Sequence, residues 1–286
     1  MNLNDLKLFE AVAHYGSFTK AAEAMFTVQS NVTARIKILE QEFGAALLVR
    51  TSRKVELTAA GKSILNYSRQ INNLLEAAKL SVGKEQSLNG PFRLGLLETT
   101  LTQQGPEIVN RMADVHPLID LHLTSGMRDA LISQVLNYRL DAALIPGPIR
   151  HDELEQLPME DERIVIVAPM QVRSLENLRA QPRIKVIVSG EGCVFRARLE
   201  AWLISHNILN YHKTVVNSVE GTIRFIESGI GFSMLPEKII STFYSGRNVR
   251  TLPLPSEIGT LTNTLIYRKE NATSPVLNAF LRLFHA

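Results

Sequence analysis

Seven small or apolar residues recur between residues 60 and 81 at alternating intervals of four and three. They are Ala60, Ile64, Tyr67, Ile71, Leu74, Ala78 and Ser81. A period of 3.5 residues over three heptads predicts one long helix with a single apolar seam, as in a coiled coil. Thr58 can start this helix, and Gly83 or the break at residues 87–91 ends it. The sequence therefore predicts a compact part on each side of a long connecting helix.

A helix between two compact parts has little of its own chain to cover. The seam is therefore expected to pack against a second copy of the chain and form a dimer. The expected contacts are Ile64, Tyr67, Ile71, Leu74 and Ala78. The alternative is an amphipathic helix that packs on its own chain.

The first 60 residues predict three short helices. Leu3, Leu6, Phe9 and Val12 follow helical spacing over residues 3–14, and Gly16 is expected to end that helix. A second short helix carries small residues at 21 and 22, which permit close packing, with Ser17 or Thr19 as its expected N-cap.

The third predicted helix has a buried stripe of four residues at intervals of four, three and four. The stripe is Val32, Ile36, Leu39 and Phe43, with Thr27 as the expected cap and Gly44 as the expected end. Two short helices joined by about three residues, the second polar outside, describe a helix-turn-helix. An ordinary three-helix unit with a polar surface is the alternative.

Hydrogen-bonding residues gather on the outer side of this third helix. Gln29 opens the helix, where side chains can reach base edges in a major groove, and the candidate contacts that follow are Ser30, Asn31, Thr33, Arg35 and Lys37. The next segment, "LLVRTSRKVELT", predicts two short extended arms with a basic tip formed by Arg50, Arg53 and Lys54. Such a wing can reach the DNA backbone or minor groove.

The charge distribution agrees with a polyanionic partner. Residues 1–90 contain 11 Lys and Arg against 8 Asp and Glu, whereas residues 91–286 contain 20 of each. The whole net charge of +3 therefore lies in the first third. A solvated basic face is the alternative reading of charge alone.

The same segment resembles the N-terminal domain of LysR-type transcriptional regulators. The matching elements are Ala21 and Ala22, Gln29, Leu39 and Glu40, Gly44, Leu47, Arg50, Arg53 and "LTAAG" at 57–61. The resemblance implies DNA binding, with Gln29, Ser30, Thr33 and Arg35 near the groove and Arg50 and Arg53 on the backbone or wing side. The chain departs from the common family pattern at Val28, Ser30 and Ala34.

From residue 91 onward, short apolar runs alternate with helical patterns. Strands are expected at 92–98, 119–126, 141–148, 163–170 and 184–192, with helices between them. This alternation predicts parallel α/β sheets. The pattern resembles the effector-binding region of the same family, with two subdomains hinged like a periplasmic binding protein.

The predicted fold class is therefore an α/β chain with an N-terminal all-α winged helix-turn-helix domain, a long linker helix and a two-subdomain effector domain. The expected domains are residues 1–60, 61–90 and 91–286. Within the last, subdomain I comprises about 91–162 and 267–286, and subdomain II about 163–266. The resemblance implies that the chain crosses between subdomains near 163 and returns near 267.

Ligands of open α/β sheets bind beyond the carboxyl ends of strands. The residues found there, as candidate effector contacts, are Thr99, Thr100, Ser125, Gly126, Pro146, Gly147, Cys193, Phe195, Asn217 and Ser218. Hydroxyls and helix N-terminal N–H groups suit a small polar or anionic molecule. The alternative is that the Ser, Thr and Asn residues only cap helices.

The leading interpretation is a cytoplasmic, ligand-responsive regulator of transcription. Its expected partners are double-stranded DNA, a small effector, RNA polymerase and its own copies, as a dimer or, as the resemblance implies, a dimer of dimers. No cofactor or metal is expected, and no run approaches the roughly 18 apolar residues of a membrane span.

Three alternatives remain at this point. Cys193 is the single cysteine and follows Gly192 at a predicted helix start, so a redox-responsive regulator is one of them. An α/β enzyme is another, although no nucleophile elbow, Walker loop or His-Glu-x-x-His motif is present. A solute-binding protein fits the C-terminal pattern but neither the N-terminal helices nor the missing export signal.

Overall fold

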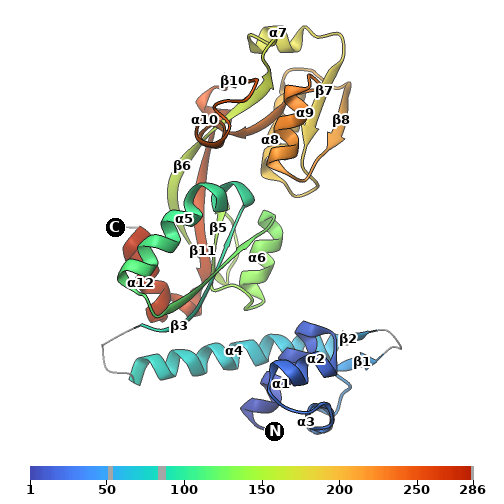
Figure 1. Ribbon diagram of the computed structural model, residues 1–286, viewed down its shortest axis with the longest axis vertical. Helices are drawn as coiled ribbons and strands as arrows, with labels where there is room; N and C mark the ends of the chain where they lie inside the picture. Colours follow the sequence, from blue (N-terminus) through green and yellow to red (C-terminus); the bar gives the residue numbers. More distant parts are fainter. Residues whose placement is uncertain (51–53, 83–87, 285–286) are drawn as a thin grey trace. The chain divides into compact units, whose positions relative to one another are not determined.

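The computed structural model describes residues 1–50, 54–82 and 88–284. The chain divides into two compact units, Met1–Gln86 and Ser87–Ala286 (Figure 1). The elements of the first unit are α1 (Leu3–Tyr15), α2 (Phe18–Ala24), α3 (Gln29–Phe43), β1 (Leu48–Arg50), β2 (Val55–Leu57) and α4 (Ala59–Val82).

The three short helices begin and end where local sequence favours it. Gly16 and Gly44 end α1 and α3 in the left-handed conformation, at φ 59° and 62°. Ser17 caps α2 by accepting a hydrogen bond from the backbone of Lys20. The predicted cap Thr27 is wrong, because α3 begins at Gln29 and the N-cap position belongs to Val28, which makes no side-chain cap bond.

The core of the first unit is built from one face of each helix. Val32, Ile36 and Leu39 of α3 are fully buried against apolar residues of α1 and α2. The prediction that Phe43 completes this stripe is wrong, because its side chain is 40% exposed. Phe43 is the last residue of α3, directly before the chain turns away at Gly44.

The wing is a short antiparallel hairpin that α3 holds in place. Strands β1 and β2 pair from Leu48 opposite Leu57. The carboxylate of Glu40 in α3 accepts hydrogen bonds from the backbone N–H groups of Leu47 and Leu48, at 2.8 and 3.2 Å. The hairpin is therefore fixed in position relative to α3.

The long helix α4 follows directly. The hydroxyl of Thr58 accepts a hydrogen bond from the N–H of Gly61, as expected for a helix start. A contact with α1 holds the first part of α4, where Ser68 and Asn72 both donate to the carboxylate of Glu10. After Asn72, the seam residues Leu74 and Ala78 are exposed at the surface of α4. The predicted helix end at Gly83 lies outside the described residues.

The elements of the second unit are β3 (Gly90–Leu96), α5 (Glu98–Val115), β4 (Ile119–Ser125), α6 (Arg128–Leu136), β5 (Ala142–Pro146), β6 (Leu154–Pro169), α7 (Leu175–Arg179), β7 (Ile184–Val188), α8 (Val194–Ser205), β8 (Tyr211–Val215), α9 (Val219–Glu227), β9 (Ser233–Pro236), α10 (Glu237–Phe243), β10 (Val249–Pro253), α11 (Ser256–Gly259), β11 (Thr260–Arg268), η1 (Lys269–Thr273) and α12 (Pro275–Phe284). In Figure 1, α5 and α12 cover one face of the β3, β4 and β5 region and α6 covers the other.

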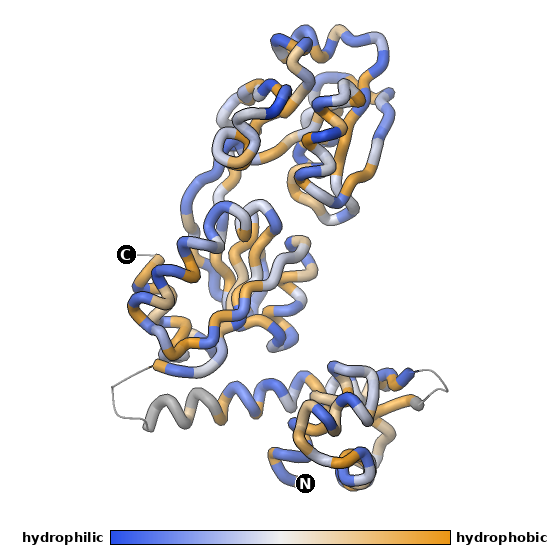
Figure 2. Tube along the Cα trace, in the orientation of Figure 1, coloured by the Kyte–Doolittle hydropathy of each residue, from blue (hydrophilic) through white to orange (hydrophobic). Residues whose placement is uncertain are grey.

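Among the described residues of this unit, seven strands form one sheet. The order is β10-β6-β11-β5-β3-β4, with β9 also paired to β6. The apolar residues of these strands run through the middle of each subdomain, while the helices alternate in hydropathy along their length (Figure 2). A separate parallel pair, β7 and β8, completes the second subdomain.

The expectation of parallel sheets is only partly right. Strand β3 is parallel to both β4 and β5, but β6, β9, β10 and β11 pair antiparallel. The reason is the crossover between the subdomains. The chain leaves along the 16-residue strand β6 and comes back along β11, so these two strands must run in opposite directions.

The crossover strands also link the two subdomains. Strand β11 pairs with β5 of the first subdomain from Asn263 onward, and its ladder with β6 is irregular between Thr262 and Thr264. Both subdomains share β6 and β11, so these two strands connect them. The subdomain boundaries near 163 and 267 stay predictions.

Candidate functional site

The outer face of α3 presents a row of hydrogen-bonding side chains. The exposed residues are Gln29, Ser30, Asn31 and Lys37, and Thr33 is half-buried. Such exposure is expected for side chains that are predicted to contact DNA. The hydroxyl of Thr19 in α2 lies 3.0 Å from the amide oxygen of Gln29. The amide of Asn31 donates to the hydroxyl of Thr27 at 2.9 Å. Both amide side chains are therefore held by the preceding segment.

Arg35 differs from its neighbours because its partner is a buried carboxylate. Its guanidinium lies 3.5 Å from the carboxylate of Asp5, which is buried and closes the capping box of α1 with Asn2. The helical position of Arg35 thus points it toward the α1 side of α3. DNA contact by Arg35 stays a prediction.

The basic wing is described only in part. Arg50 ends β1, and Lys54 precedes β2 and forms an ion pair with Glu56. The predicted contact Arg53 lies outside the described residues. The roles of the three residues stay predictions from the sequence.

Two residues of the turn between α2 and α3 were missed by the sequence reasoning. Phe26 is 99% exposed and Val28 is 64% exposed. Val28 directly precedes Gln29, the first residue of α3, and Phe26 lies two positions before Val28. Hydrophobic side chains count toward a predicted core in a sequence pattern, so their exposure could not be predicted.

The predicted seam of α4 lies open to solvent in the single chain. Tyr67 is 58% exposed and Leu74 is 69% exposed, and Ile71 and Ala78 are also exposed. Ile64 is half-buried and packs against the core of the first unit. A row of apolar side chains on one helix face suits a partner helix.

In the second unit, a pocket of about 520 Å³ lies between the two subdomains. Its wall from the first subdomain includes Arg128, Pro146 and Gly147, and its wall from the second runs from Glu191 to Glu200. The pocket brings together three predicted effector contacts, Pro146, Gly147 and Cys193.

Three arginines line the same pocket, and the sequence reasoning did not assign them to a ligand. Arg128 donates to the carbonyls of Pro146 and Pro148, both at 3.0 Å. Arg196 pairs with Glu200 at 3.0 Å. Arg198 donates to the carbonyl of Ile258. The sequence places Arg128 and Arg196 near the starts of helices, but it does not show that these helices face one pocket.

Arg198 has the environment of an anion-binding group. Burial lowers the pKa of its guanidinium, because removal from water disfavours the charged form. In the part of the chain that the structure describes, no carboxylate lies within ion-pairing distance of Arg198. An anion in the pocket would restore the electrostatic stabilisation that this cation loses by burial.

The other predicted effector contacts do not line this pocket. Thr99 and Thr100 are buried in the first turn of α5, and the Thr99 hydroxyl has no hydrogen-bond partner among the described residues. Ser218 caps α9 by accepting a hydrogen bond from the N–H of Gly221. This is the helix-capping role that was the alternative to ligand contact. Asn217 accepts from the N–H of Gly190 at 2.8 Å and joins two loops of the second subdomain.

Three predicted contacts remain. Ser125 is exposed at the end of β4, and Gly126 lies against Leu131 of α6. Phe195 is buried and faces a small internal cavity that Cys193 also lines. As ligand contacts, these residues stay predictions.

A second pocket, also about 520 Å³, lies against β6 on a different set of elements. Its lining comes from α5, β6 and α10 and includes Gln103, Glu162, Arg163, Lys238 and Arg247. Two of its cations have carboxylate partners: Arg163 pairs with Glu237 at 3.5 Å, and Arg247 pairs with Glu220 and Glu227. Burial raises the pKa of Glu162, although the Gln103 amide donates to its carboxylate at 2.9 Å.

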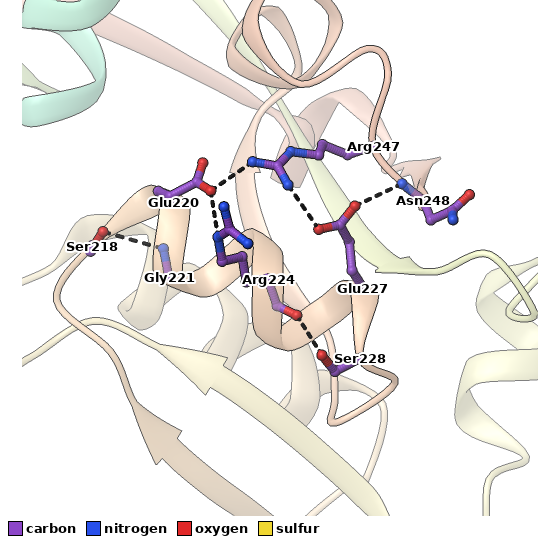
Figure 3. A network of polar contacts seen from close by, with 8 residues as sticks. All are labelled: Ser218, Glu220, Gly221, Arg224, Glu227, Ser228, Arg247 and Asn248. Carbon is purple, nitrogen blue, oxygen red and sulfur yellow. Dashed lines mark hydrogen bonds and ion pairs between the residues drawn. The ribbon is translucent and has the colours of Figure 1, made fainter.

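Arg247 is the most firmly held of these cations. Figure 3 shows its guanidinium between Glu220 and Glu227 of α9, at 2.6 and 3.3 Å. Arg224 also pairs with Glu220, at 2.7 Å, and the N–H of Asn248 donates to Glu227. The network fastens α9 to the segment before β10. Among the described residues, each pocket has one cation without an ion-paired carboxylate, Lys238 in this pocket and Arg198 in the other. The two cations differ in burial, since Lys238 is exposed and Arg198 is half-buried.

Among the described residues, no three His, Cys, Asp or Glu side chains come together in a group that could hold a metal ion. None of the described helices has the length and apolar character needed to cross a membrane.

Comparison with known proteins matches both units. Residues 3–62 match the model described as bacterial regulatory helix-turn-helix protein, lysR family, and residues 85–286 match the LysR substrate binding domain. The chain is 34% identical over 284 residues to the uncharacterized HTH-type transcriptional regulator YusT of Bacillus subtilis, covering 99% of this chain and 95% of that protein. It is 31% identical to the transcriptional regulator GltR of the same organism, with 98% and 95% covered.

Solved structures share the fold. A full-length OxyR variant from Pseudomonas aeruginosa superposes with a TM-score of 0.77 at 21% identity, covering 100% of this chain and 94% of that one. Full-length CbnR in complex with its target DNA superposes with a TM-score of 0.70 at 20% identity, with 100% and 99% covered. The predicted fold class is confirmed.

Proposed function

The chain belongs to the lysR family of bacterial regulatory helix-turn-helix proteins, and we propose that it regulates transcription as a homo-oligomer that binds a two-fold DNA site and responds to a small anionic molecule. DNA binding and an effector domain are properties of the family. The two-fold site, the class of effector and the residues are the proposal.

One observation carries the choice of effector. The pocket between the subdomains contains Arg198, a partly buried cation that pairs only with a backbone carbonyl among the described residues. Arg128, which pairs with the exposed Asp129 at 3.4 Å, enters the same pocket from the opposite subdomain. A carboxylate between these two guanidinium groups would form charge-assisted hydrogen bonds to both subdomains at once.

Bridging the subdomains supplies a mechanism. Strands β6 and β11 connect the two subdomains. A ligand that contacts the pocket walls of both subdomains would therefore favour one angle between them over another. A ligand shifts such an equilibrium only by its difference in affinity for the two states. The expected output is a change in how the effector units pack in the oligomer, and through it in the spacing or bend of the bound DNA.

The proposed dimer uses α4. Its exposed apolar residues Tyr67, Ile71 and Leu74 would pack against their counterparts from a second copy. A two-fold dimer presents two recognition helices to two DNA half-sites. A dimer of dimers is the larger assembly that we propose on the family pattern, with contact to RNA polymerase at the promoter. Because the partner is DNA, we place the protein in the cytoplasm.

Thermal unfolding of the full chain with a panel of small carboxylic and other metabolites tests the effector class. A ligand at 100 times its dissociation constant stabilises the folded state by about 2.7 kcal/mol, a shift that is easily measured. Arg198→Gln should abolish the shift. Arg163→Gln, an exposed arginine of the second pocket, is the matched control and should retain it.

The two alternatives to this proposal give different results. If Arg163→Gln rather than Arg198→Gln removes the shift, the ligand occupies the second pocket. A redox-responsive regulator is the second candidate, since Cys193 lines the first pocket. It requires Cys193→Ser to abolish a response of DNA binding to peroxide, and an unchanged response excludes it.

A further inference from the structure

The turn of the helix-turn-helix exposes two large apolar side chains within the three residues that precede Gln29, the proposed base-reading residue. Phe26 is 99% exposed and Val28 is 64% exposed, and Gln29 follows immediately. The surrounding described side chains, Thr27 and Asn31, are hydrogen-bonded to each other. The two apolar side chains therefore form a small apolar patch among polar neighbours on the surface of the protein.

Val28 is an unfavourable choice for its position in the isolated protein. It occupies the N-cap of α3 and makes no side-chain bond to the first turn. Elsewhere in the same chain, Ser17, Ser174 and Ser218 cap α2, α7 and α9 with their hydroxyls, whereas α5, α6 and α8, like α3, begin without a side-chain cap bond. Ser or Thr is favoured at this position because its oxygen satisfies a free N–H group.

Phe26 is unfavourable for a different reason. Its backbone lies in the left-handed region at φ 51°, which non-glycine residues rarely adopt. Its side chain, almost entirely in water, gains nothing from the fold to offset that conformation. Natural sequences break local rules of this kind mostly at functional sites.

The major groove of DNA contains one apolar group that could pack against these two side chains. Base edges there carry hydrogen-bond donors and acceptors, and the C5-methyl group of thymine is the apolar exception. The exposed Val28, directly before Gln29, and the exposed Phe26 of the same turn fit that methyl group better than they fit a phosphate or a polar base edge. A patch of two side chains is also too small to hold a protein partner, since stable interfaces bury about 800 Å² on each side.

We propose that Val28 is a specificity-determining residue that contacts the C5-methyl group of a thymine in each half-site, and that Phe26 excludes water from this contact. The inference rests on the proposed DNA binding and extends it to the base next to the one that Gln29 reads. Removal of one methylene-sized apolar contact corresponds to a change of about four-fold in affinity.

The test uses the full-length protein and a duplex chosen by selection from a random DNA library. Each thymine of the selected half-site is replaced in turn by deoxyuridine, which removes only the methyl group, and affinity is measured by fluorescence anisotropy. One position should weaken wild-type binding about four-fold. Val28→Ser should bind the thymine duplex more weakly and show no further loss with deoxyuridine at that position.

A second readout separates this role from a structural one. Val28→Ser and Phe26→Asn should both raise the melting temperature, because the first adds a cap and the second suits the left-handed backbone, while both weaken binding. Val28→Thr is the matched control, since it keeps one methyl group and should keep part of the sensitivity to deoxyuridine.

The outcomes separate the inference from the proposed function. If no duplex is selected, the proposed function fails. If a duplex is selected but wild-type affinity is indifferent to deoxyuridine at every position, or Val28→Ser keeps the full sensitivity, the inference is wrong and DNA binding stands.

Discussion

The hydroxyl of Thr19, in the first turn of α2, donates a hydrogen bond of 3.0 Å to the side-chain oxygen of Gln29, the first residue of α3. This bond joins the two helices of the helix-turn-helix at the surface that faces outward. It fixes which way the Gln29 amide points and directs its NH₂ group away from Thr19. A reading side chain that is already oriented loses less conformational entropy when it binds a base.

Gln29→Ala should therefore lose discrimination between DNA sequences. We expect a loss of about 1 to 3 kcal/mol against the wrong base, because a paired amide contact is removed. Thr19→Val should cause a smaller loss in the same direction, since the amide remains but is no longer held. Affinities for the selected and a scrambled duplex, measured at one salt concentration, give the difference. Equal losses on both duplexes for Gln29→Ala would remove its assigned role.

The α4 seam predicts an effect on assembly. Changing both Ile71 and Leu74 to Asp introduces charge into the proposed helix pair, and we expect monomers with much weaker binding to a two-fold site. Both side chains are exposed in the single chain, so the fold should remain intact. Sedimentation measures the mass, and circular dichroism controls for folding. A folded double variant with the wild-type mass would contradict the seam.

Gly61 predicts an effect on stability alone. A Cβ atom at this position would lie 2.0 Å from the backbone oxygen of Leu47, where the wing meets α4. Since neither backbone can give way cheaply, Gly61→Ala should destabilise the first unit by about 2 kcal/mol or more. Gly44→Ala is a useful comparison, because its Cβ meets no atom and its cost comes only from the left-handed backbone. Denaturant unfolding measures both, and a neutral Gly61→Ala would contradict the close approach.

Thr99 predicts opposite effects on stability and response. Its buried hydroxyl has no partner among the described residues, and Thr99→Val replaces it by a methyl group of similar shape. Removal of an unsatisfied buried group should stabilise the unliganded protein by about 1 kcal/mol. If that hydroxyl holds the effector, the variant should also lose its effector response and keep its DNA affinity. A full response would leave Thr99 without a role in the ligand site.

The sequence by itself determined the elements whose causes are local. The stripe of Val32, Ile36 and Leu39, the left-handed ends at Gly16 and Gly44 and the Ser17 cap each depend on residues within a few positions of one another. The heptad spacing of α4 is equally local. Periodicity and capping therefore predicted the helices of the first unit and the long connecting helix.

Neighbouring elements decided the rest. A pattern of apolar residues cannot state whether Phe26, Val28 or Phe43 will be covered, because burial depends on which helix lies opposite. The exposed edge of the turn appears only when α1, α2 and α3 are packed together.

The second unit shows the same division at longer range. Strands β6 and β11 are about 100 residues apart, and only the tertiary structure shows that they pair antiparallel and connect the two subdomains. Arg128 and Arg198 line one pocket although 70 positions separate them. Local patterns fix how each segment folds, but the meeting of distant segments depends on closing the chain between them. For that reason, the pocket arginines could be recognised only in the tertiary structure.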